Sequence, residues 1–243
     1  LSNRDFKTLL VDLDPQGNAT NLYLKTKLNI SNEVGHFDKT LMSSVEDGNL
    51  DSSIINIKDN LDLLASAPDF SLYPRYMEKH HNYNDRVKEF DRLLTPLKAK
   101  YDYVIIDIPP TISLITDSAL YASDYCLIVM QTHEHSFEGA EAFIKYIQEE
   151  VIDEYQAPRL ELVGILAVLL QAGAPVDEAT VANAISEFGE ENLFKTRIHS
   201  MQRLKRFGIT GITFRSKFDK RVFAVYKDVT DELLKRIEVI EHG

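Results

Sequence analysis

The chain has 243 residues, and its 44% hydrophobic and 27% charged residues are typical of a globular protein. No apolar run approaches the roughly 18 residues of a membrane span, and no secretory signal is visible. The single cysteine, Cys126, excludes an internal disulfide, so we expect a cytoplasmic setting.

The net charge of −11 argues at first against a nucleic-acid-binding protein, but the charge is unevenly distributed. The segment Lys195–Arg221 contains nine Lys or Arg residues and one acid, Asp219, and so carries +8. The rest of the chain then carries −19. This asymmetry indicates a local basic surface on an acidic body.

The first half of the chain alternates short apolar runs with stretches of helical periodicity. It predicts strands at Thr8–Val11 and Leu61–Ala65, and helices at Asn18–Leu24, Lys39–Val45 and Asp85–Leu97. Asn18 is expected to cap the first of these helices. Residues Tyr73–Asn84 lack a clear period, which indicates a surface loop with a helical turn.

The second half continues this alternation. The predicted strands are Tyr103–Ile106, Tyr125–Gln131, Leu162–Leu170 and Leu193–Ile198. The predicted helices are Ile115–Tyr121, one from Ser136 to Ile152, Val176–Phe188 and Lys220–Ile240. Together the elements predict an α/β fold in which helices flank a doubly wound, mostly parallel sheet, with residues 1–243 in one domain.

Acidic residues follow two of the predicted strands. The run Tyr103–Ile106, which we expect to be buried on both faces of the sheet, leads into Asp107. The strand Thr8–Val11 likewise leads into Asp12 and Asp14. Open α/β sheets bind ligands at the carboxyl ends of their strands, and such an aspartate commonly holds Mg²⁺ beside a nucleotide phosphate. The alternative is an ordinary turn-forming aspartate.

These two segments resemble the ParA branch of the deviant-Walker-A ATPases, which segregate plasmids and chromosomes. The resemblance is carried by LLVDLDPQGNATN (Leu9–Asn21) and YDYVIIDIPPTISLITDSALYASD (Tyr101–Asp124). It continues through QTHEHSFEG (Gln131–Gly139) and VGILAVLL (Val163–Leu170). It implies a P-loop NTPase fold, ATP and Mg²⁺ as cofactors, and dimerisation.

The resemblance also implies roles for individual residues. Asp14 corresponds to the switch carboxylate that positions the attacking water, and Asp12 is its neighbour in the catalytic set. Asp107 corresponds to the Walker B carboxylate near Mg²⁺, with Asp12 as a second metal contact partly through water. Gln16 and Pro109 are expected beside the nucleotide.

The chain departs from the family pattern in one respect. The phosphate-binding loop, with its glycines and signature lysine, should precede Asp12, yet no glycine here begins a G-x-x-x-x-G-K-[ST] pattern. The first residue is Leu1 rather than methionine. We therefore expect the loop and a central strand to lie upstream, with ATPase activity belonging to the parent protein.

The basic segment is the candidate DNA-binding site. Its phosphate-contacting candidates are Arg203, Lys205, Arg206, Arg215, Lys217, Lys220 and Arg221. Phe207, Phe214 and Phe218 are interleaved with them, and the alternative is a solvated face whose phenylalanines point into the core. Basic residues near the C-terminus bind DNA without sequence preference in the resembled family, and Arg203 lies where one is expected.

Other sites and branches are less well supported. His133 and His135 have no third ligand at metal-binding spacing, which favours a polar strand-end loop. The acidic C-terminus DVTDELLKRIEVIEHG does not suit the membrane-binding helix of the MinD branch. A lone cysteine cannot supply the cluster of the nitrogenase-iron-protein branch.

The sequence thus indicates a nucleoid-associated partition ATPase with no membrane partner. Its expected partners are nonspecific DNA, a second copy of the chain, and a centromere-binding, ParB-like adaptor that stimulates hydrolysis. The alternative is a non-catalytic regulatory or scaffold protein that keeps the fold and the DNA surface without ATP turnover.

Overall fold

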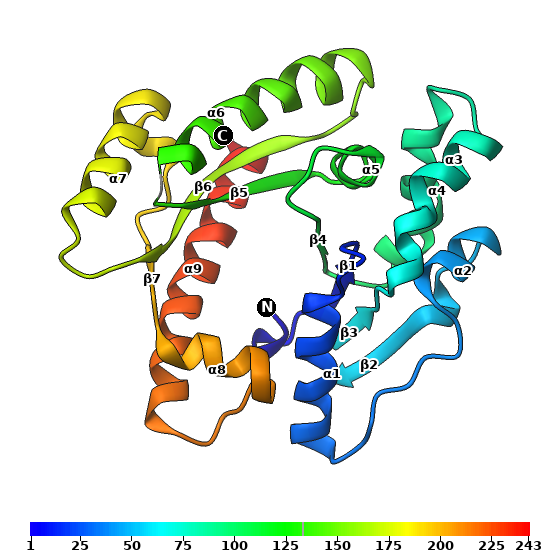
Figure 1. Ribbon diagram of the computed structural model, residues 1–243, viewed down its shortest axis with the longest axis horizontal. Helices are drawn as coiled ribbons and strands as arrows, with labels where there is room; N and C mark the ends of the chain where they lie inside the picture. Colours follow the sequence, from blue (N-terminus) through cyan, green and yellow to red (C-terminus); the bar gives the residue numbers. More distant parts are fainter. Residues whose placement is uncertain (133) are drawn as a thin grey trace. The chain divides into compact units, whose positions relative to one another are not determined.

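The computed structural model describes residues 1–132 and 134–243; the side chains of 134–136 are outside the description (Figure 1). Its internal contacts divide the chain into two compact units. The first unit comprises Leu1–Ala122 and Arg206–Thr213, and the second comprises Ser123–Lys205 and Phe214–Gly243. Among the described residues, no helix is long and apolar enough to cross a membrane.

In the described residues, the sheet of the first unit has the strand order β2-β3-β1-β4. Its strands are β1 (Thr8–Asp12), β2 (Ile54–Lys58), β3 (Leu61–Leu64) and β4 (Tyr103–Asp107). Strand β1 pairs in parallel with both β3 and β4, and β2 pairs antiparallel with β3. The carboxyl ends of the three parallel strands therefore lie at the same edge of this sheet.

Helices cover both faces of this sheet. They are α1 (Asn18–Ser31), α2 (Leu41–Glu46), α3 (Tyr73–His80), α4 (Asp85–Lys98) and α5 (Leu114–Tyr121). Leu9 and Val11 of β1 are buried in a core that they share with α2, α3, α4 and α5. The alternate residue, Leu10, packs in a second core with Tyr23 and Leu24 of α1. The period of two along β1 thus places α1 opposite the other helices.

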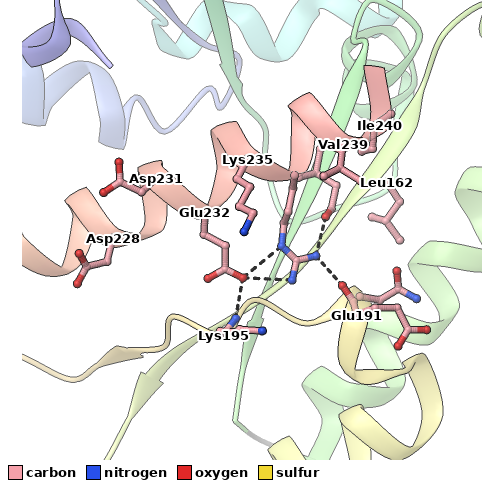
Figure 2. A pocket seen from close by; sticks show the side chains of 12 residues that line it. Leu162, Glu191, Lys195, Asp228, Asp231, Glu232, Lys235, Val239 and Ile240 are labelled. Carbon is pink, nitrogen blue, oxygen red and sulfur yellow. Dashed lines mark hydrogen bonds and ion pairs between the residues drawn. The ribbon is translucent and has the colours of Figure 1, made fainter. Parts of the chain in front are cut away.

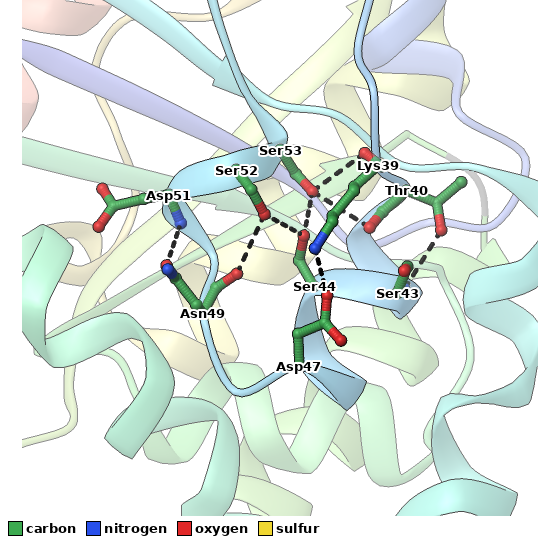
Figure 3. Close-up of polar contacts among 9 residues, drawn as sticks. All are labelled: Lys39, Thr40, Ser43, Ser44, Asp47, Asn49, Asp51, Ser52 and Ser53. Carbon is green, nitrogen blue, oxygen red and sulfur yellow. Dashed lines mark hydrogen bonds and ion pairs between the residues drawn. The ribbon is translucent and has the colours of Figure 1, made fainter.

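A network of hydroxyl groups holds α2 against the segment that follows it (Figure 3). The Oγ atoms of Ser44 and Ser53 are hydrogen-bonded to each other, and both residues are buried. Ser53 Oγ also donates to the carbonyl oxygens of Lys39 (3.0 Å) and Thr40 (3.1 Å). These bonds satisfy hydroxyls that would otherwise be buried without partners, and they give the cluster a structural role.

In the described residues, the sheet of the second unit is parallel and has the order β5-β6-β7. Its strands are β5 (Tyr125–Gln131), β6 (Glu161–Leu170) and β7 (Ile198–His199). Its helices are α6 (Glu134–Tyr146), a π-helical continuation (Ile147–Glu154), α7 (Pro175–Phe188) and α9 (Lys217–His242). Residues of α6 and α7 share one core with this sheet, and residues of α9 share another. Helix α8 (Gln202–Thr210) contains the boundary between the two units.

The predicted fold class is confirmed, and several local predictions are corrected. Residues Tyr73–His80 form helix α3 rather than a loop, because Tyr73 and Met77 anchor one face of it in the core. Strand β2 and helix α8 were not predicted. Of the predicted strand Leu193–Ile198, Leu193 forms an isolated bridge and Ile198 begins β7. Helix α1 runs beyond Leu24, and its N-cap is Gly17, not Asn18.

Candidate functional site at the carboxyl ends of β1 and β4

Asp12 and Asp107 are direct neighbours across two paired strands. Strands β1 and β4 run in parallel, and their register places Asp12 opposite Asp107 at the last pair. The backbone N–H of Leu13 also donates to the carbonyl oxygen of Asp107 (2.8 Å), which extends the pairing past the strand end. The two carboxylates predicted at strand ends are therefore brought to one place.

Asp12 is fully buried, and both of its carboxylate oxygens accept hydrogen bonds. Oδ1 accepts from the backbone N–H of Asp14 (3.0 Å). Oδ2 accepts from the backbone N–H and the hydroxyl of Thr20, both at 2.7 Å. Gly17, the N-cap of α1, has no side chain to cap the helix, so Asp12 satisfies a first-turn N–H in its place. Both oxygens are thus engaged within the fold, and Asp12 orders the turn; its expected contact with Mg²⁺, partly through water, stays a prediction.

Asp14 lies in the turn between β1 and α1, and it is partly exposed. Its Oδ1 accepts from the backbone N–H of Gln16 (2.9 Å), and its carbonyl oxygen accepts from the N–H of Gly17 (2.8 Å). Gly17 has φ of 61°, the left-handed conformation that glycine adopts readily. Among the described residues, Oδ2 of Asp14 accepts no hydrogen bond, so this oxygen is available to a ligand or a water molecule. Gln16 is exposed in the same turn.

Asp107 has the opposite character to Asp12. Its residue is exposed, and its carboxylate accepts no hydrogen bond from the described part of the chain. The surrounding protein nevertheless desolvates part of the carboxylate. This desolvation, together with the charges of Asp12 and Asp14, raises the pKa of Asp107 to about 6. A bound cation would relieve this repulsion, so Asp107 fits a Mg²⁺ contact, directly or through water. Pro109, two residues further on, is half-buried.

The described side chains do not complete a metal centre. Among them, no group of three or more His, Cys, Asp or Glu residues is arranged to hold a metal ion. Hard cations such as Mg²⁺ are often held by one or two carboxylates together with substrate phosphates. The geometry therefore fits a cation that binds with a phosphate-bearing ligand. His133 and the side chain of His135 are outside the described residues.

The basic residues predicted to bind DNA fall into two groups. Lys205, Arg206, Arg215, Lys217, Lys220 and Arg221 are exposed. Arg203 is different, because its Nε donates to Oδ1 of Asp219, which is fully buried in the first turn of α9. Of the interleaved phenylalanines, Phe207 is buried, whereas Phe214 and Phe218 are exposed. Phe214 stacks on Phe223 with centroids 4.6 Å apart.

Comparison with known proteins identifies the family. A family model described as an AAA domain matches residues 1–162. The chain is 29% identical over 197 residues to the chromosome partitioning protein ParA of Myxococcus xanthus, covering 79% of this chain and 64% of that protein. It is 27% identical over 203 residues to the sporulation initiation inhibitor protein Soj of Bacillus subtilis, covering 82% and 74%. The chain belongs to the ParA-type family of partition ATPases.

The fold of this ParA-type chain is also that of solved structures. It matches a plasmid partition protein of Borrelia burgdorferi bound to AMPPNP with a TM-score of 0.74 and 20% identity. This match covers 96% of the chain and 88% of that structure. The match to the Myxococcus protein covers 64% of that protein's length, which is less than two thirds.

The second unit of the ParA-type chain contains a pocket of about 620 Å³ along one face of α9 (Figure 2). Arg236 of α9 lies at its wall and donates to the carbonyl oxygens of Val163 (3.2 Å) and Glu191 (2.7 Å). It also pairs with Glu232 at 3.2 Å. Arg236 thus joins α9 to the start of β6 and to the segment at Glu191. Its N–H groups in these contacts donate to protein oxygens rather than to a ligand in the pocket.

Sequence reasoning assigned no structural role to two residues, Thr20 of this site and Asp219 of the basic segment. Thr20 binds Asp12 from α1, and nothing in a single sequence distinguishes it from other threonines. Asp219 binds Arg203 and forms a capping box with Ser216, since each side chain accepts from the other's backbone N–H. The spacing Ser216-x-x-Asp219 is a helix-start signal that was visible in the sequence.

Proposed function

We propose that this chain is the body of a ParA-type partition ATPase. The parent protein binds Mg-ATP, dimerises, and associates with DNA without sequence preference. A centromere-binding adaptor stimulates hydrolysis and releases it. The observation that carries the proposal is the pairing of Asp12 with Asp107 at the ends of β1 and β4, beside the Asp14 turn. A ligand with phosphates and a cation fits this edge of the sheet.

In this proposal the three carboxylates have separate roles. Asp107 contacts Mg²⁺, which would neutralise charge that develops on the transferred phosphoryl group. Asp14 orients the attacking water through the oxygen that its own turn leaves unused. Asp12 holds the turn in place through Asp14 and Thr20. Gln16 and Pro109 lie on the segments that follow the two strands, where the nucleotide would be bound.

The proposal requires a phosphate-binding loop beside this edge of the sheet. Strand β4 ends the strand order of the first unit's sheet and β5 ends that of the second unit's, as far as the structure describes them. Ile105 on β4 is 39% exposed and Val129 on β5 is 60% exposed, which is unusual for apolar residues of parallel strands. A further strand beside either edge would cover such residues. This observation supports a further strand at one of these edges.

DNA binding rests on the exposed basic residues of α8 and of the start of α9. Six cations with exposed side chains supply contacts for phosphates, and the charge of −19 on the rest of the chain repels DNA elsewhere. The exposed Phe214 and Phe218 oppose the alternative in which all the phenylalanines of this segment belong to the core.

The test is Asp14→Ala in the full-length protein, with Glu46→Ala as a control at an exposed carboxylate of α2. We expect Asp14→Ala to retain Mg-ATP binding and dimerisation and to lose ATP turnover, because the water-orienting group acts after binding. Glu46→Ala should match the wild type in all three assays. Wild-type turnover in Asp14→Ala would contradict the assignment. DNA binding by a wild-type protein that never hydrolyses ATP would favour the scaffold alternative.

A further inference from the structure

Helix α1 is anchored by polar contacts at two levels. Its buried residues are Thr20, in the first turn, and Thr26, about 9 Å further along the helix axis. The remaining α1 residues are partly or fully exposed. A helix that covers a sheet normally buries an apolar stripe. In α1, Tyr23 and Leu24 are only partly buried against the sheet, whereas the two buried positions carry hydroxyl groups, and each is bonded to a different segment.

The first anchor joins α1 to the carboxylate turn. Thr20 donates to Asp12 through both its backbone N–H and its hydroxyl, at 2.7 Å each. The hydroxyl of Thr20 also accepts from the backbone N–H of Ser66 (2.9 Å), beyond the end of β3. Asp12 also accepts a hydrogen bond from the N–H of Asp14. A movement of the Asp12–Asp14 turn would therefore displace the first turn of α1.

The second anchor joins α1 to the end of α8 and the residues after it (Figure 1). The hydroxyl of Thr26 accepts from the backbone N–H of Ile212 (2.9 Å). The side chains of two neighbouring residues bind carbonyl oxygens of the same segment: Lys25 Nζ to Gly208 (3.0 Å), and Asn29 Nδ2 to Thr210 (2.7 Å).

Gly211 shows how closely this segment lies against α1. It has φ of 78°, and a Cβ at this position would lie 2.6 Å from the carbonyl carbon of Lys25. A larger residue could be accommodated only if the segment moved away from α1. The contact is therefore made backbone to backbone, and it begins directly after Lys205 and Arg206.

We infer that α1 is the route by which the state of the Asp12–Asp14 turn reaches residues 208–212, next to the exposed Arg206, and so changes DNA binding. The inference rests on the proposed function and adds the structural route. A helix moves as a rigid body, so a shift of its first turn is transmitted to Lys25, Thr26 and Asn29. Hydrogen bonds are directional, and they tie the position of residues 208–212 to that of the helix. The route is physically continuous within the first unit.

The experiment compares Thr26→Val with Thr180→Val in the full-length protein. Both threonines are buried in helices and donate to the carbonyl oxygen four residues earlier, but only Thr26 also accepts from the α8 segment. The readout is the ratio of the duplex DNA dissociation constants without and with Mg-ATP. We expect Thr26→Val to reduce this ratio by about fivefold or more, within the range of allosteric couplings, and to leave the Mg-ATP affinity without DNA unchanged. Thr180→Val should keep the wild-type ratio.

A second pair of variants avoids buried positions. Lys25→Met loses the bond to Gly208, whereas Lys27→Met loses the same charge on the same helix, and its bond is to Asn56 (2.9 Å). We expect only Lys25→Met to reduce the ratio. If Mg-ATP leaves the DNA dissociation constant of the wild-type protein unchanged, the proposed function is overturned. A wild-type response that Thr26→Val and Lys25→Met both retain in full would overturn the α1 route alone.

Discussion

Arg203 and Asp219 form a buried ion pair at the start of α9. The Nε of Arg203 donates to Oδ1 of Asp219, and Oδ2 accepts from the backbone N–H groups of Arg215 (2.9 Å) and Ser216 (3.1 Å). The Asp219 side chain is fully buried, and that of Arg203 is 21% exposed. Arg203 therefore has a structural partner, which changes how a substitution at this position must be interpreted.

Arg203→Ala should destabilise the protein by about 3 kcal/mol, because it removes a cation that is hydrogen-bonded to the buried Asp219 carboxylate. The free energy of unfolding in urea measures this effect. Lys205→Ala is the control on the same helix, and because Lys205 is exposed we expect a change of no more than about 0.5 kcal/mol. Equal stability of the two variants would show that the ion pair contributes nothing.

DNA binding is better tested at exposed cations than at Arg203. Replacing Lys205 or Arg206 with alanine should weaken binding to two unrelated duplexes equally. Each replacement should also reduce the log–log salt slope by about 1, the mark of one lost phosphate contact. Lys235→Ala on the exposed side of α9, outside the basic segment, is the control. A strong preference for one duplex, or an unchanged slope, would leave the segment as an ordinary solvated surface.

Asp107 should make stability depend on pH in a defined direction. Its folded-state pKa of about 6 lies above 3.8, the ordinary pKa of an aspartate, which we take for the unfolded chain. The folded protein therefore holds this proton more tightly than the unfolded chain. Its contribution to stability is therefore greatest below about pH 4 and is lost as the pH rises to about 6. Asp107→Asn should be more stable than the wild type at pH 8, and the difference should shrink at pH 5.

Urea unfolding at both pH values measures this difference, without nucleotide or Mg²⁺. Asp228→Asn, at an exposed aspartate of α9, is the matched control and should show the same difference from the wild type at each pH. A pH-independent difference for Asp107→Asn would mean that the carboxylate is not perturbed by burial or by Asp12 and Asp14.

Gly164 should not tolerate alanine, because a Cβ there would lie 2.7 Å from the carbonyl oxygen of Asn192 and 2.9 Å from Arg236 Nη1. Its φ of 143° adds strain for any other residue. We expect Gly164→Ala to cost about 1–3 kcal/mol in unfolding free energy. In α6, no described atom outside the helix's own backbone and the adjacent residues lies within 4 Å of a Cβ added at Gly139. Gly139→Ala should therefore stabilise the protein by about 0.5–1 kcal/mol. Thermal or urea unfolding distinguishes the two signs.

Local patterns were sufficient to predict most of the elements and the position of a carboxylate at the ends of two strands. Apolar runs such as Tyr125–Gln131 and Leu162–Leu170 are strands because their composition and length suit a buried sheet, whatever their neighbours. Asp12 and Asp107 could be predicted at strand ends for the same reason, since each directly follows such a run. Helix α3 was missed although Tyr73 and Met77 are four residues apart, the spacing of one helical face, because the Tyr, His and Asn residues around them obscure this short pattern.

Tertiary structure alone decided which residues meet. The pairing of β1 with β4, and so of Asp12 with Asp107, joins segments far apart in the chain, and no local pattern specifies that register. The burial of Asp219 likewise separates Arg203 from the other basic residues, although the sequence presents them as one cluster. Charge and spacing are properties of the sequence. Desolvation and hydrogen-bond partners depend on the packed fold, and they determine whether a charged side chain supports the structure or faces a ligand.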